Sequence, residues 1–214
     1  MSDPANPIRT VAVYCSASNT VHPEYLALAR RVGAMIASGG RAIVYGGGKV
    51  GLMGELARGG RDAGGRVIGV ITTRLRDAEQ LDEANHENII VAAMRERKGI
   101  IESRGDALLV LPGGLGTMEE FFEVLTGRLL GEHDKPIIVL NAKDPVGGGH
   151  YYDPLLAMIR HMIELKFAKP GIMSLFEIAS DENEVARMLA AHERRPEGVS
   201  PPDRAHMLPT SPGE

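Results

Sequence analysis

Hydrophobic residues along the chain alternate between short unbroken runs and longer stretches in which they recur every three or four positions. The short runs are typical of strands covered on both faces of a parallel sheet, and the periodic stretches are typical of helices. The predicted strands cover residues 10–15, 42–45, 66–71, 89–91, 107–111, 136–140 and 175–179. The predicted helices cover residues 22–38, 52–63, 94–104, a segment that opens at 116–117, 152–165, and a last segment that follows Ser180 or Asp181 and ends near His192. Residues 72–88 are charged and are expected to be irregular.

The regular alternation of strand and helix predicts the fold class α/β. It implies a parallel sheet, and right-handed crossovers make that sheet doubly wound with helices on both faces. The single domain is expected to span residues 10–193, between a flexible N-terminal segment, residues 1–9, and a disordered proline-rich tail, residues 194–214. Ligands of such sheets bind beyond the carboxyl ends of the strands, so we expect a site in the turns that follow strands.

The turn after the strand at 107–111 carries the strongest candidate chemistry. Pro112-Gly113-Gly114 ends the strand and Gly116-Thr117 opens a helix, for which Thr117 is the predicted N-cap and Glu120 its capping-box partner. A glycine turn that leads into a helix leaves backbone N–H groups beside the positive end of the helix dipole, which suits a phosphate. Glu119 and Glu120 lie within one turn of that seat. They either complete the cap and favour the dipole, or they serve a part of the ligand other than its phosphate.

A second glycine turn, Gly46-Gly47-Gly48, follows the strand at 42–45. With Gly51 it matches G-x-G-x-x-G, the spacing of a dinucleotide-binding turn. The acidic residue that should follow the next strand and bind the ribose is missing, which argues against a nicotinamide oxidoreductase. The turn either brings backbone close to one phosphate or sugar, or its glycines serve strand-to-helix packing. Neither glycine turn has the spacing of a Walker A loop.

Met94-Arg95-Glu96-Arg97-Lys98 places three cations on one helical turn near the expected ligand edge. Such a charge run is usually a solvated face. Arg and Lys are also the residues that an anionic ligand requires beside a phosphate-binding helix start. The residues by themselves leave both interpretations open.

Composition narrows the remaining function classes. The chain has 214 residues, 43% hydrophobic and 24% charged, with a net charge of −4 and no Trp. These values are those of a globular protein with neither the basic face nor the aromatic platforms that nucleic acids require. No apolar run approaches the roughly 20 residues of a membrane span. The lone cysteine, Cys15, and the absence of a signal-peptide pattern in residues 1–9 predict the cytoplasm. The seven histidines show no pair at ligand spacing, so no metal is expected.

Together these segments resemble the Lonely Guy family, the cytokinin riboside 5′-monophosphate phosphoribohydrolases, which have also been described as lysine decarboxylases. The resemblance rests on P-G-G-L-G-T-M-E-E at 112–120, M-R-E-R-K at 94–98, Y-G-G-G-K-V-G-L-M-G at 45–54 and L-G-E-H-D-K-P at 130–136. It implies a Rossmann-like fold, usually a homodimer, and no cofactor. The implied reaction is hydrolysis of the N-glycosidic bond of a nucleoside 5′-monophosphate to a free base and ribose 5-phosphate.

Carried over residue by residue, the resemblance makes Arg97 and Glu120 the catalytic pair. The expected substrate-binding residues, from the resemblance and from the two glycine turns, are Glu79, Lys98, Gly113, Gly114, Leu115, Gly116, Thr117, Met118, Glu119, Thr126, Gly46, Gly47 and Gly48. The chain departs from the family pattern in having Thr72 where a proline is common and a loop at 141–150 longer than the family's N-x-x-G-Y-Y. Both border the expected base pocket, so the base (prenylated adenine, adenine or another) stays open.

Other functions on the same scaffold remain to be separated. A non-catalytic nucleotide or cofactor carrier, such as the molybdenum-cofactor carriers that resemble this family, needs the phosphate turn but no carboxylate aimed at C1′. A general AMP or purine-nucleotide nucleosidase would use the same residues for salvage. A DNA-associated protein is disfavoured by the negative net charge. A PLP-dependent decarboxylase would need a Schiff-base lysine and an acid facing the pyridinium nitrogen, and the sequence shows no such framework.

Overall fold

The structure is a computed structural model that describes residues 7–78 and 80–193. The flexible segment and the tail predicted at the two ends, apart from residues 7–9, lie outside the described residues, as does Glu79. Seven parallel strands form one sheet in the order β4-β3-β2-β1-β5-β6-β7, which confirms the predicted α/β fold class. The strands are β1 Thr10–Tyr14, β2 Ala42–Tyr45, β3 Val67–Thr72, β4 Glu87–Val91, β5 Ala107–Val110, β6 Ile137–Leu140 and β7 Glu177–Ala179.

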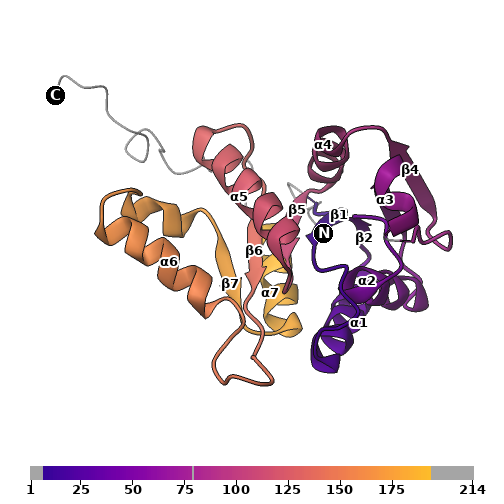
Figure 1. Ribbon diagram of the computed structural model, residues 1–214, viewed down its shortest axis with the longest axis horizontal. Helices are drawn as coiled ribbons and strands as arrows, with labels where there is room; N and C mark the ends of the chain where they lie inside the picture. Colours follow the sequence, from indigo (N-terminus) through magenta and orange to yellow (C-terminus); the bar gives the residue numbers. More distant parts are fainter. Residues whose placement is uncertain (1–6, 79, 194–214) are drawn as a thin grey trace, which may run out of the picture.

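Helices cover both faces of this sheet (Figure 1). The helices are α1 Pro23–Ser38, α2 Gly51–Asp62, α3 Thr73–Ala78, α4 Met94–Arg104, α5 Leu115–Leu130, α6 Asp153–Glu164, the 3₁₀ helix η1 Pro170–Ser174 and α7 Glu182–Glu193. Side chains of α1, α2 and α7 pack into one core with one face of the sheet. Side chains of α4, α5 and α6 pack into a second core on the other face. No helix among the described residues is long and apolar enough to cross a membrane.

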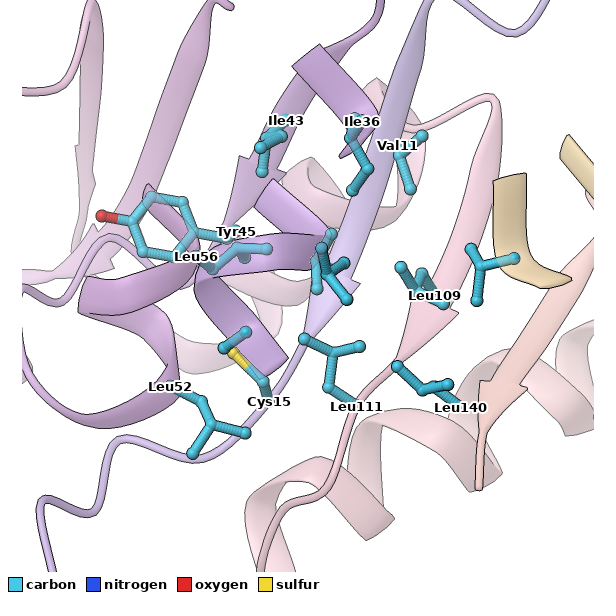
Figure 2. Close-up of a cluster of buried hydrophobic side chains, with 14 of the residues drawn as sticks. Val11, Cys15, Ile36, Ile43, Tyr45, Leu52, Leu56, Leu109, Leu111 and Leu140 are labelled. Atoms are coloured by element: carbon cyan, nitrogen blue, oxygen red, sulfur yellow. The ribbon is translucent and has the colours of Figure 1, made fainter. Parts of the chain in front are cut away.

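The two cores explain why the strands have unbroken apolar sequences. Successive side chains of a strand point to opposite faces, so Val11 and Val13 enter the first core while Ala12 enters the second. Figure 2 shows the first core, in which side chains of the central strands meet those of α1 and α2. Helices α1 and α2 approach each other closely at Gly33, where an added Cβ would lie 2.1 Å from the carbonyl oxygen of Leu56.

Two short helices of the structure were not predicted from the sequence. Helix α3 lies in the stretch that was expected to be irregular. It was not predicted because its charged sequence shows no helical period of apolar residues. A hydrogen bond from the Leu75 N–H to Thr72 Oγ1 at 3.2 Å fixes the start of the helix. The 3₁₀ helix at Pro170–Ser174 was also not predicted, since one turn is too short to show periodicity. Before α7, Asp181 Oδ1 accepts a hydrogen bond from the Glu184 N–H, as expected for a cap at this position.

Candidate functional site

The expected site lies at the carboxyl edge of the sheet, where β1 and β5 pair in its centre. The chain leaves β1 through α1 toward β2 on one side, and leaves β5 through α5 toward β6 on the other. The loops that follow these strands touch, because the Ser16 N–H donates to the carbonyl oxygen of Pro112 at 3.4 Å. The start of α2 joins them, since the Met53 N–H donates to the carbonyl oxygen of Ser16 at 3.2 Å. This reversal of strand order is the switch point at which doubly wound sheets bind ligands.

Helix α5 begins at Leu115, so its N-cap lies three residues before Thr117. Gly114 is the N-cap, in an extended conformation, and no side chain caps the helix. The prediction of Thr117 as the N-cap, with Glu120 in a capping box, is therefore wrong. Thr117 is instead buried against Gly113, where an added Cβ would lie 2.1 Å from Thr117 Oγ1. Because no side chain caps the first turn of α5, its backbone N–H groups keep the character of an anion-binding helix start.

Arg97 is buried in the protein although it lies in a highly charged segment. Its side chain projects from α4 and donates from Nε to the carbonyl oxygen of Val70 at 3.0 Å and from Nη2 to that of Gly46 at 2.9 Å. Only 4% of Arg97 is exposed, whereas Arg95 and Glu96 are exposed. The solvated-face interpretation therefore holds for Arg95 and Glu96 but not for Arg97. Since a guanidinium does not lose its proton in proteins, the carbonyls of Val70 in β3 and of Gly46 directly after β2 hold a permanent positive charge.

Glu120 brings a buried negative charge to the same sheet edge. It lies on the second turn of α5 and is 8% exposed. Phe121, the next residue of α5, packs in the same core as Tyr14, the last residue of β1. Burial, and after it the charge of Glu120, raises the pKa of Tyr14. In the register of β1 and β2, Val13 pairs with Tyr45, so Tyr14 and Gly46 follow side by side. Arg97, bound to Gly46, and Glu120, close to Tyr14, thus converge on neighbouring strand ends.

Lys98 contacts two carboxylates of α5. Its Nζ forms ion pairs with Glu119 and, at 2.9 Å, with Glu123. Burial of Lys98 disfavours its charge, but the hydrogen bonds that it donates to the two carboxylates, together with their negative charges, outweigh burial and raise the pKa of Lys98. Of the two neighbouring carboxylates considered in the sequence, Glu119 is therefore exposed and paired with Lys98, while Glu120 is buried beside Tyr14. The two residues occupy different electrostatic environments.

The glycine turn Gly46-Gly47-Gly48 lies beside Arg97. An added Cβ at Gly46 would lie 2.3 Å from Arg97 Nη2, and Gly47 has a φ of +80°, which favours glycine. Gly48 forms an isolated bridge with Leu81, and the Gly47 carbonyl oxygen accepts from the Asp82 N–H at 2.9 Å. The segment that follows Glu79 is thus bound to this turn.

The remaining predicted residues fall into two groups. Gly114, Leu115, Gly116 and Met118 lie on the first turn of α5 or just before it, and Leu115 is 91% exposed. Thr126 is exposed on the same helix, eleven residues beyond Leu115. At the helical rise per residue this separation is about 16 Å. The structure therefore brings the first group to the helix start but not Thr126.

Two tyrosines that the sequence analysis did not single out contact the turn at 111–114, called the phosphate turn here because a phosphate is expected beside it. The Tyr151 hydroxyl donates to the carbonyl oxygen of Gly113 at 2.8 Å, and the Tyr152 hydroxyl donates to that of Leu111 at 2.6 Å. The available signal was their place after the strand at 136–140, on the same edge of the sheet. Within the described residues, no three His, Cys, Asp or Glu side chains are grouped so that they could hold a metal ion.

Comparison with known proteins shows which family the chain resembles in sequence. Residues 53–189 match the family described as "Possible lysine decarboxylase". The chain is 41% identical over 181 residues to the cytokinin riboside 5′-monophosphate phosphoribohydrolase of Mycobacterium tuberculosis, covering 85% of this chain and 93% of that protein. It is 36% identical over 191 residues to an enzyme of the same name from Arabidopsis thaliana, covering 89% of this chain and 81% of that protein.

Among solved structures, the chain resembles the molybdenum cofactor binding protein of Rippkaea orientalis. The TM-score is 0.62 with 21% sequence identity, over 87% of this chain and 97% of that one. At 21% identity this likeness shows only that the two proteins share a fold. The two phosphoribohydrolases, 41% and 36% identical over most of both sequences, show the family. The chain therefore belongs to the Lonely Guy family of cytokinin riboside 5′-monophosphate phosphoribohydrolases.

Proposed function

We propose that this protein hydrolyses the N-glycosidic bond of a nucleoside 5′-monophosphate and releases the free base and ribose 5-phosphate. The observation that carries the proposal is the pair of buried, oppositely charged side chains, Arg97 and Glu120, at neighbouring strand ends beside the uncapped start of α5. Relatives that share about two fifths of the sequence are named as phosphoribohydrolases, which agrees with this chemistry.

The uncapped helix start is the proposed seat of the 5′-phosphate. Backbone N–H groups from Gly114 to Thr117 and the positive end of the α5 dipole favour an anion there. The ribose would then extend toward Glu120, one turn further along the helix. This arrangement gives a reason for a buried carboxylate close to an anion seat: it acts on the sugar and not on the phosphate.

Glu120 has the properties needed at the reacting sugar. Cleavage of a ribosyl–base bond passes through a sugar with oxocarbenium character, as in glycoside hydrolysis. A carboxylate at this point binds ribose hydroxyls, orients or deprotonates the attacking water, and stabilises positive charge as it develops at C1′. Its place on the second turn of α5 fixes the carboxylate relative to the phosphate seat.

Arg97 supplies a fixed positive charge and not a proton. A guanidinium does not lose its proton in proteins, and two N–H groups of Arg97 are held by the carbonyls of Val70 and Gly46. A guanidinium fixed in this way favours the ionised form of a nearby carboxyl group. It also stabilises negative charge on the departing base.

Two finer predictions remain part of this proposal. The first is a homodimer, which would cover apolar side chains exposed on α5 and α6, among them Leu130 at 56% and Met158 at 52%. Its measurement is the mass in solution by light scattering. The second is a cytoplasmic location, which rests on composition alone.

The proposal is tested by base release from AMP, GMP, CMP and isopentenyladenosine monophosphate, quantified by chromatography. Glu120→Gln and Arg97→Ala should each reduce release at least 1,000-fold, about 4 kcal/mol of transition-state stabilisation. The matched controls are Glu96→Gln and Arg95→Ala, exposed neighbours on α4 that should keep wild-type rates. Wild-type activity in either site variant would remove the role assigned to that residue.

A non-catalytic carrier is the second candidate, favoured by the fold likeness to a molybdenum cofactor binding protein. A carrier would bind nucleotides without releasing base from any of the four substrates.

The choice of base distinguishes two roles for the hydrolase. The rates for AMP and for the prenylated nucleotide, compared as kcat/KM, separate hormone production from general nucleotide salvage.

A further inference from the structure

The loop between β6 and α6 reaches back to the phosphate turn. Its tip is closed by a hydrogen bond from the Asp144 N–H to the carbonyl oxygen of Gly149 at 3.0 Å. Its end is fixed by Asn141, whose Oδ1 accepts from the Tyr152 N–H at 2.6 Å and whose Nδ2 donates to Asp153 Oδ1 at 2.9 Å. This bracing holds Tyr151 and Tyr152 in place at the carboxyl edge of the sheet.

The two tyrosine hydroxyls bind two carbonyl groups of the turn, those of Leu111 and Gly113. The Tyr151 hydroxyl donates to the Gly113 carbonyl oxygen at 2.8 Å. The Tyr152 hydroxyl donates to the Leu111 carbonyl oxygen at 2.6 Å. Burial raises the pKa of Tyr152, so its hydroxyl keeps the proton that it donates.

The same tyrosines connect the phosphate turn to the other side of the switch point. The ring of Tyr151 meets the ring of Tyr25 edge to face with centroids 5.5 Å apart, and it meets the ring of Tyr152 at 4.8 Å. Tyr25 lies in the first turn of α1, which follows β1. The turn after β5 is thus held against a rigid aromatic group that includes residues from α1 and from the loop after β6.

We propose that Tyr151 and Tyr152 are positioning residues for the 5′-phosphate of the substrate. By holding the carbonyl groups of Leu111 and Gly113, they fix the direction in which the chain enters α5, and with it the N–H groups from Gly114 to Thr117. In this arrangement the tyrosines hold carbonyl oxygens of the turn and leave these four N–H groups to the anion. The inference rests on the proposed function, since it takes the start of α5 as the phosphate seat.

The test compares Tyr151→Phe and Tyr152→Phe with the control Tyr25→Phe, which keeps the ring contact and removes a hydroxyl from outside the turn. Calorimetric titration with ribose 5-phosphate should show a dissociation constant about fivefold higher for each site variant, the change expected for one lost hydrogen bond, and an unchanged value for the control. Residual hydrolysis of the nucleoside that lacks the phosphate should be the same in all four proteins. Tyr151 is 36% exposed, so its variant should melt at the wild-type temperature.

The outcomes separate this inference from the proposed function. Wild-type affinity for ribose 5-phosphate in Tyr151→Phe overturns the positioning role even if the protein is an active hydrolase. An equal loss on the nucleoside and the nucleotide also overturns it, because that would be a general effect on the site. If no base is released from any nucleotide but Tyr151→Phe still weakens ribose 5-phosphate binding, the hydrolase proposal fails and the positioning role stands.

Discussion

Replacing Gly46 by alanine would test whether the placement of Arg97 governs activity. The new Cβ would lie 2.3 Å from Arg97 Nη2 and 2.8 Å from Met53 Cε, so the guanidinium would have to move by about 1 Å to reach an ordinary contact distance. The backbone itself is not the obstacle, because Gly46 does not have a positive φ.

The displacement has a cost that can be estimated from the contacts of Arg97. Moving away from Gly46 weakens the 2.9 Å hydrogen bond to its carbonyl oxygen and strains the 3.0 Å bond to Val70. Hydrogen bonds to a charged group contribute about 1.5–3 kcal/mol each. A displacement of about 1 Å in a catalytic group costs on the order of 100-fold in rate. We therefore expect kcat/KM of Gly46→Ala to fall about 100-fold, or about 2.7 kcal/mol.

The assay is base release from the best nucleotide substrate, with the melting temperature measured in parallel. The matched control is Gly99→Ala, on the same helix as Arg97, where an added Cβ meets nothing within 4 Å. Alanine in place of a helix-interior glycine should stabilise that variant by about 0.5–1 kcal/mol and leave kcat/KM unchanged. A Gly46→Ala protein with more than half of the wild-type kcat/KM would refute the role given to the position of Arg97.

Two further predictions concern stability. Gly59→Ala would place a Cβ 2.0 Å from the Arg30 carbonyl oxygen, so it should lower the free energy of unfolding by about 2–3 kcal/mol in urea, while Gly99→Ala does not. Burial lowers the pKa of His133, so the unfolded state binds more protons and stability should fall as pH drops from about 6.5 through the folded-state pKa. His133→Gln should therefore lose less stability than wild type between pH 7.5 and pH 5.5 in the same assay; an equal loss would contradict this assignment.

The pattern of apolar residues predicts most of the fold because buried parallel strands and amphipathic helices have distinct periods. The strand at 107–111 and the helix at 94–104 are clear for this reason, and the structure has them within one residue. The start of α5 could not be fixed in the same way. Thr117 and Glu120 satisfy the local capping pattern, but the contact of Thr117 with Gly113 decides the geometry, and that contact depends on the turn as it folds.

The sequence predicts the sheet edge that carries the candidate site, but it does not predict which charged side chains are buried there. Arg95 and Arg97 are the same residue type two positions apart, yet one is exposed and the other is buried against carbonyls of β3 and of the turn after β2. Which of them faces inward depends on how α4 packs, and that helix has little apolar patterning to indicate it. The contacts of Tyr151 and Tyr152 with the turn join residues about 40 positions apart, which no local pattern encodes.

The different environments of Glu119 and Glu120 distinguish a hydrolase from a carrier. A protein that only binds an anionic nucleotide gains nothing from a buried carboxylate beside the phosphate, since the two negative charges repel and burial of the carboxylate is itself costly. Glu119 is exposed and pairs with Lys98, whereas Glu120 is buried and its charge is one of the causes that raise the pKa of Tyr14. The amide of Glu120→Gln can still hydrogen-bond ribose hydroxyls and no longer repels the phosphate. This variant should therefore bind AMP at least as tightly as wild type while its base release falls at least 1,000-fold. Weaker AMP binding in this variant would mean that the carboxylate serves ground-state binding and not the reacting sugar.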